Sequence, residues 1–200
     1  DCNQFELTLS LDTNTKSIER NGQTFETSTT ITVPYGKQIN LNATPKAGYS
    51  FDKWTDELSG FEMFTLRIGN STTVTTSASY SFTMPDNAVS YKAWSVANTD
   101  TPYTVVHKQQ NLDDVRYGIV ADTDYLTGTT DTQTVATANT YEGFTAKAIE
   151  QLNIHGDGST VVEVLYDRNK HTLEVQDAMH VDSHTPTQND VKYEQETTIT

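Results

Sequence analysis

TPYTVVHKQQNLDD at residues 101–114, LTGTT at 126–130, YEGFTAKA at 141–148 and DGSTVVEVLYDRN at 157–169 are the four parts of the stretch that decides the fold. The first and last parts alternate apolar with polar residues, which is typical of half-buried β-strands. The Gly-Thr and Asp-Gly pairs are turn signals. The stretch therefore predicts a small β-rich unit, in which two flanking strands are joined through turns and a Gly-aromatic bend.

The rest of the chain has the same character. Residues 5–11 alternate strictly, and residues 37–43 and 88–96 also alternate apolar with polar side chains. Residues 24–33 suit a strand because they are rich in β-branched side chains. In the second half, residues 132–138 are predicted to form a further strand.

One segment favours a helix. Residues 145–152 (TAKAIEQL) are long enough for about two helical turns. We therefore expect a mostly β protein of the α+β class, built from tandem β-grasp-like modules with at most one short helix in each.

Composition excludes several classes of protein. The 200 residues allow one large or two ordinary domains, and no apolar run approaches the roughly 20 residues that span a bilayer. The net charge of -14 argues against nucleic acid as a partner, because phosphate binding needs clustered Lys and Arg. Cys2 is the only cysteine, so an intrachain disulfide is impossible. No leader precedes Asp1, so we expect a mature or excised segment.

The two halves of the chain repeat one order of elements: strand, turn, strand, Gly-aromatic bend, variable insert, tight turn and closing strand. A short polar linker with a proline lies between them at 97–102. We therefore place a first module at 1–98 and a second module at 102–170.

Residues 171–200 begin a third, incomplete copy, in which Tyr193 falls opposite Phe25 and Ile199 opposite Ile31. These residues either open the next module or are donated to a neighbouring copy by strand addition. The residues expected to pair in either case are Val191, Tyr193, Thr197 and Ile199.

The second half has an opening strand at 103–107, a Gly-Thr turn at 128–129, a Gly-aromatic bend at 141–144 and a closing run at 157–169. In this order they resemble the mucin-binding-type and internalin-type B repeats of Gram-positive surface proteins, also described as Listeria-Bacteroides repeat-like. Residues 33–96 resemble the divergent form of the B repeat, through GYSFDKW at 48–54 and FTMPDN at 82–87. The resemblance implies β-grasp-like modules that form the stalks of adhesins on bacterial cell walls. Some such modules carry a Lys–Asn crosslink, and Lys92, Lys147 and Asn169 are available for one, although no sequence order selects a pair.

No catalytic site is predicted, because the sequence lacks a Gly-rich phosphate loop, a His-Glu-x-x-His helix and a nucleophile elbow. We therefore expect no enzyme activity and no cofactor. His180 and His184, with Asp177 and Asp182, are interpreted as a polar connector rather than a metal site.

Two kinds of ligand stay open. Asp122, Asp124 and Asp131 could bind calcium, but they lack the EF-hand spacing and its closing Glu, so we assign no metal ligand. Trp54 and Trp94 are the candidates for binding a glycan, since aromatic rings stack on sugars; burial in a core is the more common role of such residues.

We therefore predict a non-enzymatic extracellular segment of a bacterial surface protein that acts as a spacer or stalk. Its expected partners are adjacent modules of the same chain or neighbouring copies. One alternative is an adhesion module that binds host glycan or mucin through exposed aromatic side chains. Another is a self-assembling filament subunit that uses its C-terminal strands for strand addition.

Overall fold

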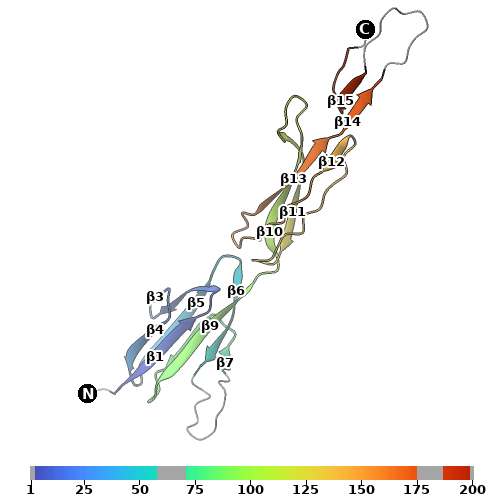
Figure 1. Cartoon of the computed structure of the whole chain (residues 1–200). Coiled ribbons are helices and arrows are strands. Elements are labelled where there is room, and N and C mark those ends of the chain that lie inside the picture. Colours follow the sequence, from blue (N-terminus) through green and yellow to red (C-terminus); the bar gives the residue numbers. More distant parts are fainter. Residues whose placement is uncertain (1–2, 58–70, 175–186, 199–200) are drawn as a thin grey trace, which may run out of the picture. The chain divides into compact units, whose positions relative to one another are not determined.

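The computed structural model describes residues 3–57, 71–174 and 187–198 (Figure 1). Every helix or strand assigned in these ranges is a β-strand. The predicted mostly β class is thus confirmed. The α+β, β-grasp detail is wrong, because in the described residues no helix packs across a sheet.

The chain forms two compact units. Unit 1 comprises residues 1–101, 129–131 and 155–157, and unit 2 comprises residues 102–128, 132–154 and 158–200. The division into folding modules at 1–98, 102–170 and 171–200 stays a prediction.

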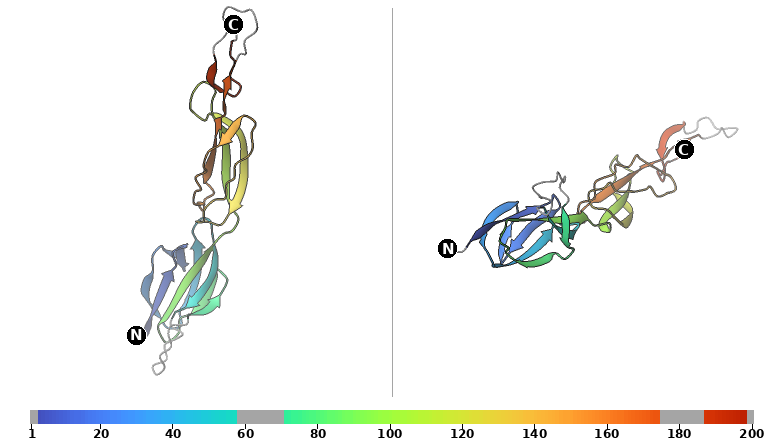
Figure 2. Two further views of the ribbon diagram at one scale, coloured as in Figure 1. Left: turned by 45° about the vertical axis from the view of Figure 1, so that its right-hand side comes forward. Right: turned by 90° about the horizontal axis from the view of Figure 1, so that it is seen from below.

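Unit 1 contains two sheets, which Figure 2 shows from two further sides. The larger sheet has the order β4-β1-β9-β6-β7 and consists of β1 (Gln4–Leu11), β4 (Thr29–Pro34), β6 (Tyr49–Asp56), β7 (Thr72–Thr75) and β9 (Val89–Ala97). The smaller sheet has the order β3-β2-β5-β8 and consists of β2 (Thr15–Arg20), β3 (Gln23–Phe25), β5 (Gln38–Pro45) and β8 (Ser79–Thr83).

One hydrophobic core joins the two sheets of unit 1. The larger sheet contributes Leu7, Leu9 and Trp54, and the smaller sheet contributes Ile18 and Leu41, all of them buried. Alternate side chains of a strand point to opposite faces, so the strict alternation read in residues 5–11 places one face of β1 in this core. The two sheets therefore pack face to face as a sandwich.

The single strand expected at 24–33 is two strands. Phe25 ends β3 in the smaller sheet, and Thr29 begins β4 in the larger sheet. Between them Ser28 accepts a hydrogen bond through Oγ from the Leu11 amide at 3.4 Å. The chain therefore passes from one sheet to the other through residues 26–28, which are exposed.

Unit 2 has one four-stranded sheet and one two-stranded sheet. The first has the order β11-β10-β13-β12 and consists of β10 (Thr101–Gln109), β11 (Ile119–Gly128), β12 (Phe144–Ala146) and β13 (Val161–Arg168). The second consists of β14 (Lys170–Leu173) and β15 (Gln188–Lys192). The core of unit 2 is a separate cluster formed by Tyr103, Val105, Ala136, Ile154, Val162, Val164 and Tyr166.

The helix expected at 145–152 is absent. Its first two residues belong to β12, and the Lys147 amide then donates to the Leu165 carbonyl at 2.8 Å. The backbone is therefore committed to pairing with β13, and an amide used in this way is not available for the helical bond to the residue four positions earlier.

The strand expected at 132–138 is also absent, apart from one isolated bridge. The Gln151 side chain holds this segment instead. Its Oε1 accepts from Thr134 Oγ1 at 2.8 Å and from the Ala136 amide at 2.9 Å, and its Nε2 donates to the Ala136 carbonyl at 2.8 Å. The side-chain amide thus extends the short backbone pairing of residues 132–134 with 152–154.

Candidate functional site

The strands at the end of the described chain pair with each other inside unit 2. β14 and β15 are antiparallel, and Val191 lies opposite His171. The strand expected over 191–200 ends at Lys192, because Glu194 has a φ of 62° and turns the backbone out of the strand. Thr197 lies outside any strand, and Ile199 lies outside the described residues.

Tyr193 lies directly after β15 and packs on the Gly-aromatic bend of unit 2. Its ring makes an edge contact with Phe144, with centroids 5.9 Å apart, and covers Gly143 so closely that a Cβ there would lie 2.2 Å from the ring. Gly143 has a φ of 76°, which only glycine adopts without strain. The glycine therefore serves both the bend and the contact with the aromatic ring.

Arg168 connects the same bend to the residues after β15. Its Nη1 donates to the Tyr193 carbonyl at 3.1 Å and to Glu194 at 2.6 Å, and its Nε donates to the Gln110 carbonyl at 2.8 Å. Its guanidinium also lies 4.8 Å from the centre of the Phe144 ring. A buried charge needs such partners, and Arg168 is only 7% exposed.

Sequence reasoning missed Arg168 and Glu194. The available signal was an arginine at the end of an apolar-alternating strand, at a position that the alternation makes inward-facing. A charge at such a position requires a buried acceptor, but the sequence does not say where along the chain that acceptor lies.

A buried polar network lies in the core of unit 2. His107 has no exposed surface; its Nδ1 lies 2.6 Å from the Tyr166 hydroxyl and its Nε2 lies 3.1 Å from Asp124. The Tyr166 oxygen also accepts from the Asn139 amide at 2.8 Å, and burial raises the pKa of Tyr166. Because these groups satisfy one another, the network is explained by core packing.

The two tryptophans have different surroundings. Trp54 has no exposed surface and donates through Nε1 to the Ala78 carbonyl at 3.0 Å, so its ring offers no face to a sugar. Trp94 is half-buried; its Nε1 donates to Thr55 Oγ1 at 2.9 Å, and Lys92 Nζ lies 3.8 Å from its ring centre. Glycan binding by Trp94 stays a prediction.

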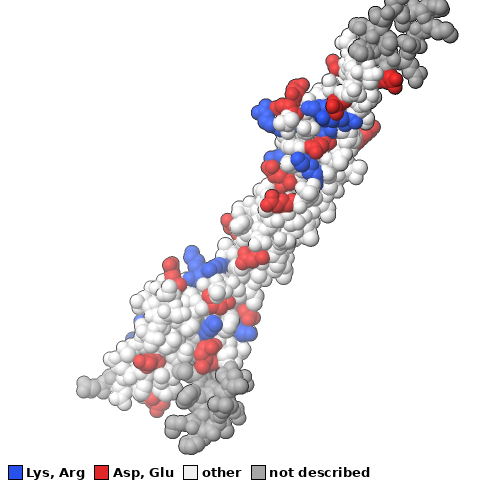
Figure 3. Space-filling model, viewed as in Figure 1, with Lys and Arg blue, Asp and Glu red and all other residues white. Residues whose placement is uncertain are grey.

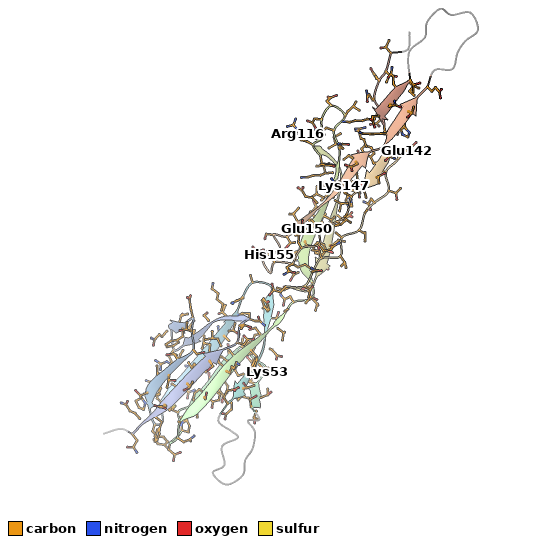
Figure 4. The ribbon with its side chains drawn as sticks, in the orientation of Figure 1. Lys53, Arg116, Glu142, Lys147, Glu150 and His155 are labelled. Atoms are coloured by element: carbon orange, nitrogen blue, oxygen red, sulfur yellow. The ribbon has the colours of Figure 1, made fainter. Side chains whose placement is uncertain are left out.

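The lysines considered for a crosslink have other partners. Lys92 lies over Trp94, and Lys147, labelled in Figure 4, donates to the Tyr117 hydroxyl at 3.3 Å. Asn169 accepts through Oδ1 from Thr145 at 2.6 Å. None of these contacts joins a lysine amine to the Asn169 side chain.

Metal binding remains open. In the part of the chain that the structure describes, no group of three or more His, Cys, Asp or Glu side chains could hold a metal ion. Asp124 bonds to His107, and Asp131 accepts from the Tyr49 hydroxyl. The connector with His180 and His184 lies outside the described residues, as does Cys2. The expectation of no metal ligand, with calcium as the alternative, stays a prediction.

Charges are dispersed on the face that Figure 3 shows, where acidic and basic side chains alternate without a basic stripe. The exclusion of nucleic acid as a partner rests on the net charge of -14 and stays a prediction. Within the described residues, no helix is long and apolar enough to cross a membrane.

Residues 13–99, most of unit 1, match the family model of the divergent InlB B-repeat domain. This part of the chain is therefore similar to the internalin-type B repeats of surface proteins. The resemblance predicted from residues 33–96 is confirmed and begins earlier, at residue 13. The resemblance of 103–169 to mucin-binding-type repeats stays a prediction.

No curated protein matches the chain. Among solved structures, the chain is similar to a double mutant of the shaft pilin SpaA from Lactobacillus rhamnosus GG, with 13% sequence identity and a TM-score of 0.29. The overlap covers 84% of this chain and 98% of the pilin chain. A TM-score of this size does not establish a shared fold.

Proposed function

We propose that the chain is a structural segment of a bacterial surface protein, which acts outside the cell as a spacer or stalk and catalyses no reaction. The match of residues 13–99 to a B-repeat domain carries this proposal. Such a role requires only that each module fold stably and contact its neighbours, because repeat proteins are held together by nearest-neighbour contacts.

The described part of 171–200 favours the stalk over the filament subunit. β14 and β15 pair with each other, and Tyr193 packs on Gly143 and Phe144 of the same chain. A strand reserved for donation to another subunit would instead leave its own sheet. The buried position of Trp54 likewise favours a structural role over glycan binding.

Surface labelling of intact producing cells tests the proposal. Antibodies raised against the purified chain should label intact cells as strongly as lysed cells, and brief protease treatment of intact cells should remove the signal. A signal that appears only after lysis would place the protein inside the cell and overturn the proposal.

Two measurements on the full chain decide between the alternatives. Light scattering should give the mass of one 22.3 kDa chain at every concentration, and immobilised mucin should not retain the protein. A mass that rises with concentration would favour the filament subunit. Retention on mucin that disappears in Trp94→Ala would favour the glycan-binding module.

A further inference from the structure

Asn169 in unit 2 holds three segments of backbone together. Its amide donates to the Gly143 carbonyl at 2.8 Å, and its Oδ1 accepts from Thr145 Oγ1 at 2.6 Å. Its own carbonyl accepts from the Tyr193 amide at 2.9 Å. We call this arrangement the asparagine clasp: an Asn directly after a closing strand binds a Gly-aromatic-Ser/Thr bend and presents its carbonyl to a turn from later in the chain.

Unit 1 contains the same arrangement. The Asn98 amide donates to the Gly48 carbonyl at 2.9 Å, and Asn98 Oδ1 accepts from Ser50 Oγ at 2.6 Å. The Asn98 carbonyl accepts from the Thr130 amide at 3.0 Å, and residues 129–131 belong to unit 1. The two clasps thus agree in all three hydrogen bonds.

The turns held by the two clasps are alike. Each has an acidic residue with left-handed backbone directly after the amide that binds the clasp: Asp131 and Glu194 both have a φ of 62°. The acidic side chain also accepts a hydrogen bond from a residue next to the clasp. Asp131 accepts from the hydroxyl of Tyr49, and Glu194 accepts from Arg168. Each turn also follows the second strand of a strand pair, β11 or β15.

The bend glycines permit the close approach of these turns. A Cβ at Gly48 would lie 2.6 Å from Thr130 Oγ1, and a Cβ at Gly143 would lie 2.2 Å from the Tyr193 ring. Both glycines also have positive φ, 77° and 76°. A side chain at either position would therefore strain the bend and occupy the space of the docked turn.

We propose that the asparagine clasp is a docking site for the opening strand pair of a following repeat, recognised through a turn whose acidic residue has positive φ. In unit 2 this strand pair is β14 and β15, so residues 170–195 dock as the start of a third module. This inference deepens the proposed function and rests on its interpretation of the chain as a repeat array.

Amide hydrogen exchange of the full chain tests the clasp. Glu194→Asn removes the carboxylate that Arg168 binds, while asparagine still tolerates positive φ. We expect the Tyr193 amide to exchange about tenfold faster in this variant, because docking of the turn weakens. Asp131→Asn should accelerate exchange of the Thr130 amide in the same way.

Asp190→Asn is the matched control. Asp190 also has positive φ, 58°, and lies in β15, but its partner is the exposed Lys170 at 3.5 Å. An exposed ion pair contributes little, so exchange at Tyr193 should change by less than about twofold.

The proposal is overturned if the wild-type Tyr193 amide exchanges at the rate of an unprotected amide, or if Glu194→Asn and Asp190→Asn have equal effects on it. Either result would leave the surface-labelling experiment unaffected. A failure of the clasp can thus be told from a failure of the spacer or stalk assignment.

Discussion

Trp54 and Trp94 lie on the paired strands β6 and β9, but they have different environments. Trp54 lies in the sandwich core with no exposed surface, whereas Trp94 is half-buried against Thr55 and Lys92. Because strand residues alternate between two faces, neighbouring strands of one sheet can direct one tryptophan inward and another outward. Their contributions to stability should therefore differ.

Trp54→Ala should lower the free energy of unfolding of unit 1 by about 3–5 kcal/mol, since it leaves a large cavity in a close-packed core. Trp94→Ala should cost less than about 2 kcal/mol, because the ring is only partly enclosed. Urea unfolding measures both, and the remaining tryptophan of each variant reports the transition by fluorescence. Equal losses in the two variants would contradict this difference in burial.

Tyr91 makes the stability of unit 1 depend on alkaline pH. Burial and then the hydrogen bond with Tyr80 raise the pKa of Tyr91 above its ordinary value. The unfolded chain therefore loses this proton at about pH 10, while the folded chain still retains it. The stabilisation is fully present below about pH 10 and is lost as pH rises through the folded pKa.

The urea midpoint of unit 1, followed by tryptophan fluorescence, should fall as pH rises above about 10. The urea midpoint of Tyr91→Phe should fall less steeply with pH, because the hydroxyl that causes part of the pH dependence is gone. Comparison of the two proteins at pH 7 corrects for any effect of the lost hydroxyl. Parallel slopes would show that Tyr91 is not the source.

At the scale of elements, Gln151 stabilises a segment that has no strand ladder. Its side chain makes three hydrogen bonds to Thr134 and Ala136, and two of them satisfy backbone groups of Ala136. Removing one partner from a buried hydrogen bond leaves the other unsatisfied, at a cost of about 1–3 kcal/mol. Gln151 should therefore contribute to holding segment 132–138, together with the backbone hydrogen bonds that Thr132 and Thr134 make to Ile154 and Leu152.

Gln151→Ala should destabilise unit 2 by about 1–3 kcal/mol and accelerate amide exchange at Ala136. Glu150→Ala is the control: Glu150 is an exposed neighbour on the same segment, so its substitution should change stability by less than about 0.5 kcal/mol. Thermal unfolding followed by far-ultraviolet circular dichroism gives both values. If Gln151→Ala is as stable as Glu150→Ala, then the Gln151 side chain does not stabilise residues 132–138.

Alternation predicted the strands whose faces are unequally buried. Residues 5–11 and 88–96 were located nearly to the residue, because a buried face imposes a period of two on the sequence. The segments 132–138 and 145–152 were predicted wrongly. Short apolar runs do not separate strand from helix, and the Gln151 contacts that decide the first segment are distant in sequence.

The candidate site was partly accessible from sequence. The Gly-aromatic bends and the restart after residue 170 were visible, and they contain Gly143 and Tyr193. Arg168 and Glu194 were not recognised as functional, and Asn169 was considered only for a crosslink to a lysine, because a hydrogen bond between residues far apart in the chain leaves no local pattern. The positive φ of Glu194 could not be predicted from the sequence either, because glutamate rarely adopts it.

At the scale of the whole molecule, the separate cores predict separate unfolding. The unit 1 core and the unit 2 core are distinct clusters. Stability in repeat proteins is close to a sum of module stabilities and neighbour contacts, so a substitution in one core should leave the other nearly unchanged. Both tryptophans of the chain belong to unit 1, which makes tryptophan fluorescence a specific probe of that unit.

Tyr166→Phe should leave His107 Nδ1 and the Asn139 amide without their shared partner and lower the stability of unit 2 by about 1–3 kcal/mol. The tryptophan-fluorescence midpoint should not move, whereas exchange of amides in β13 should accelerate. Trp54→Ala should give the opposite result, with a lower fluorescence midpoint and unchanged β13 exchange. A common shift of both probes in either variant would mean that the two cores unfold as one cooperative body, and the modular description of the chain would then be wrong.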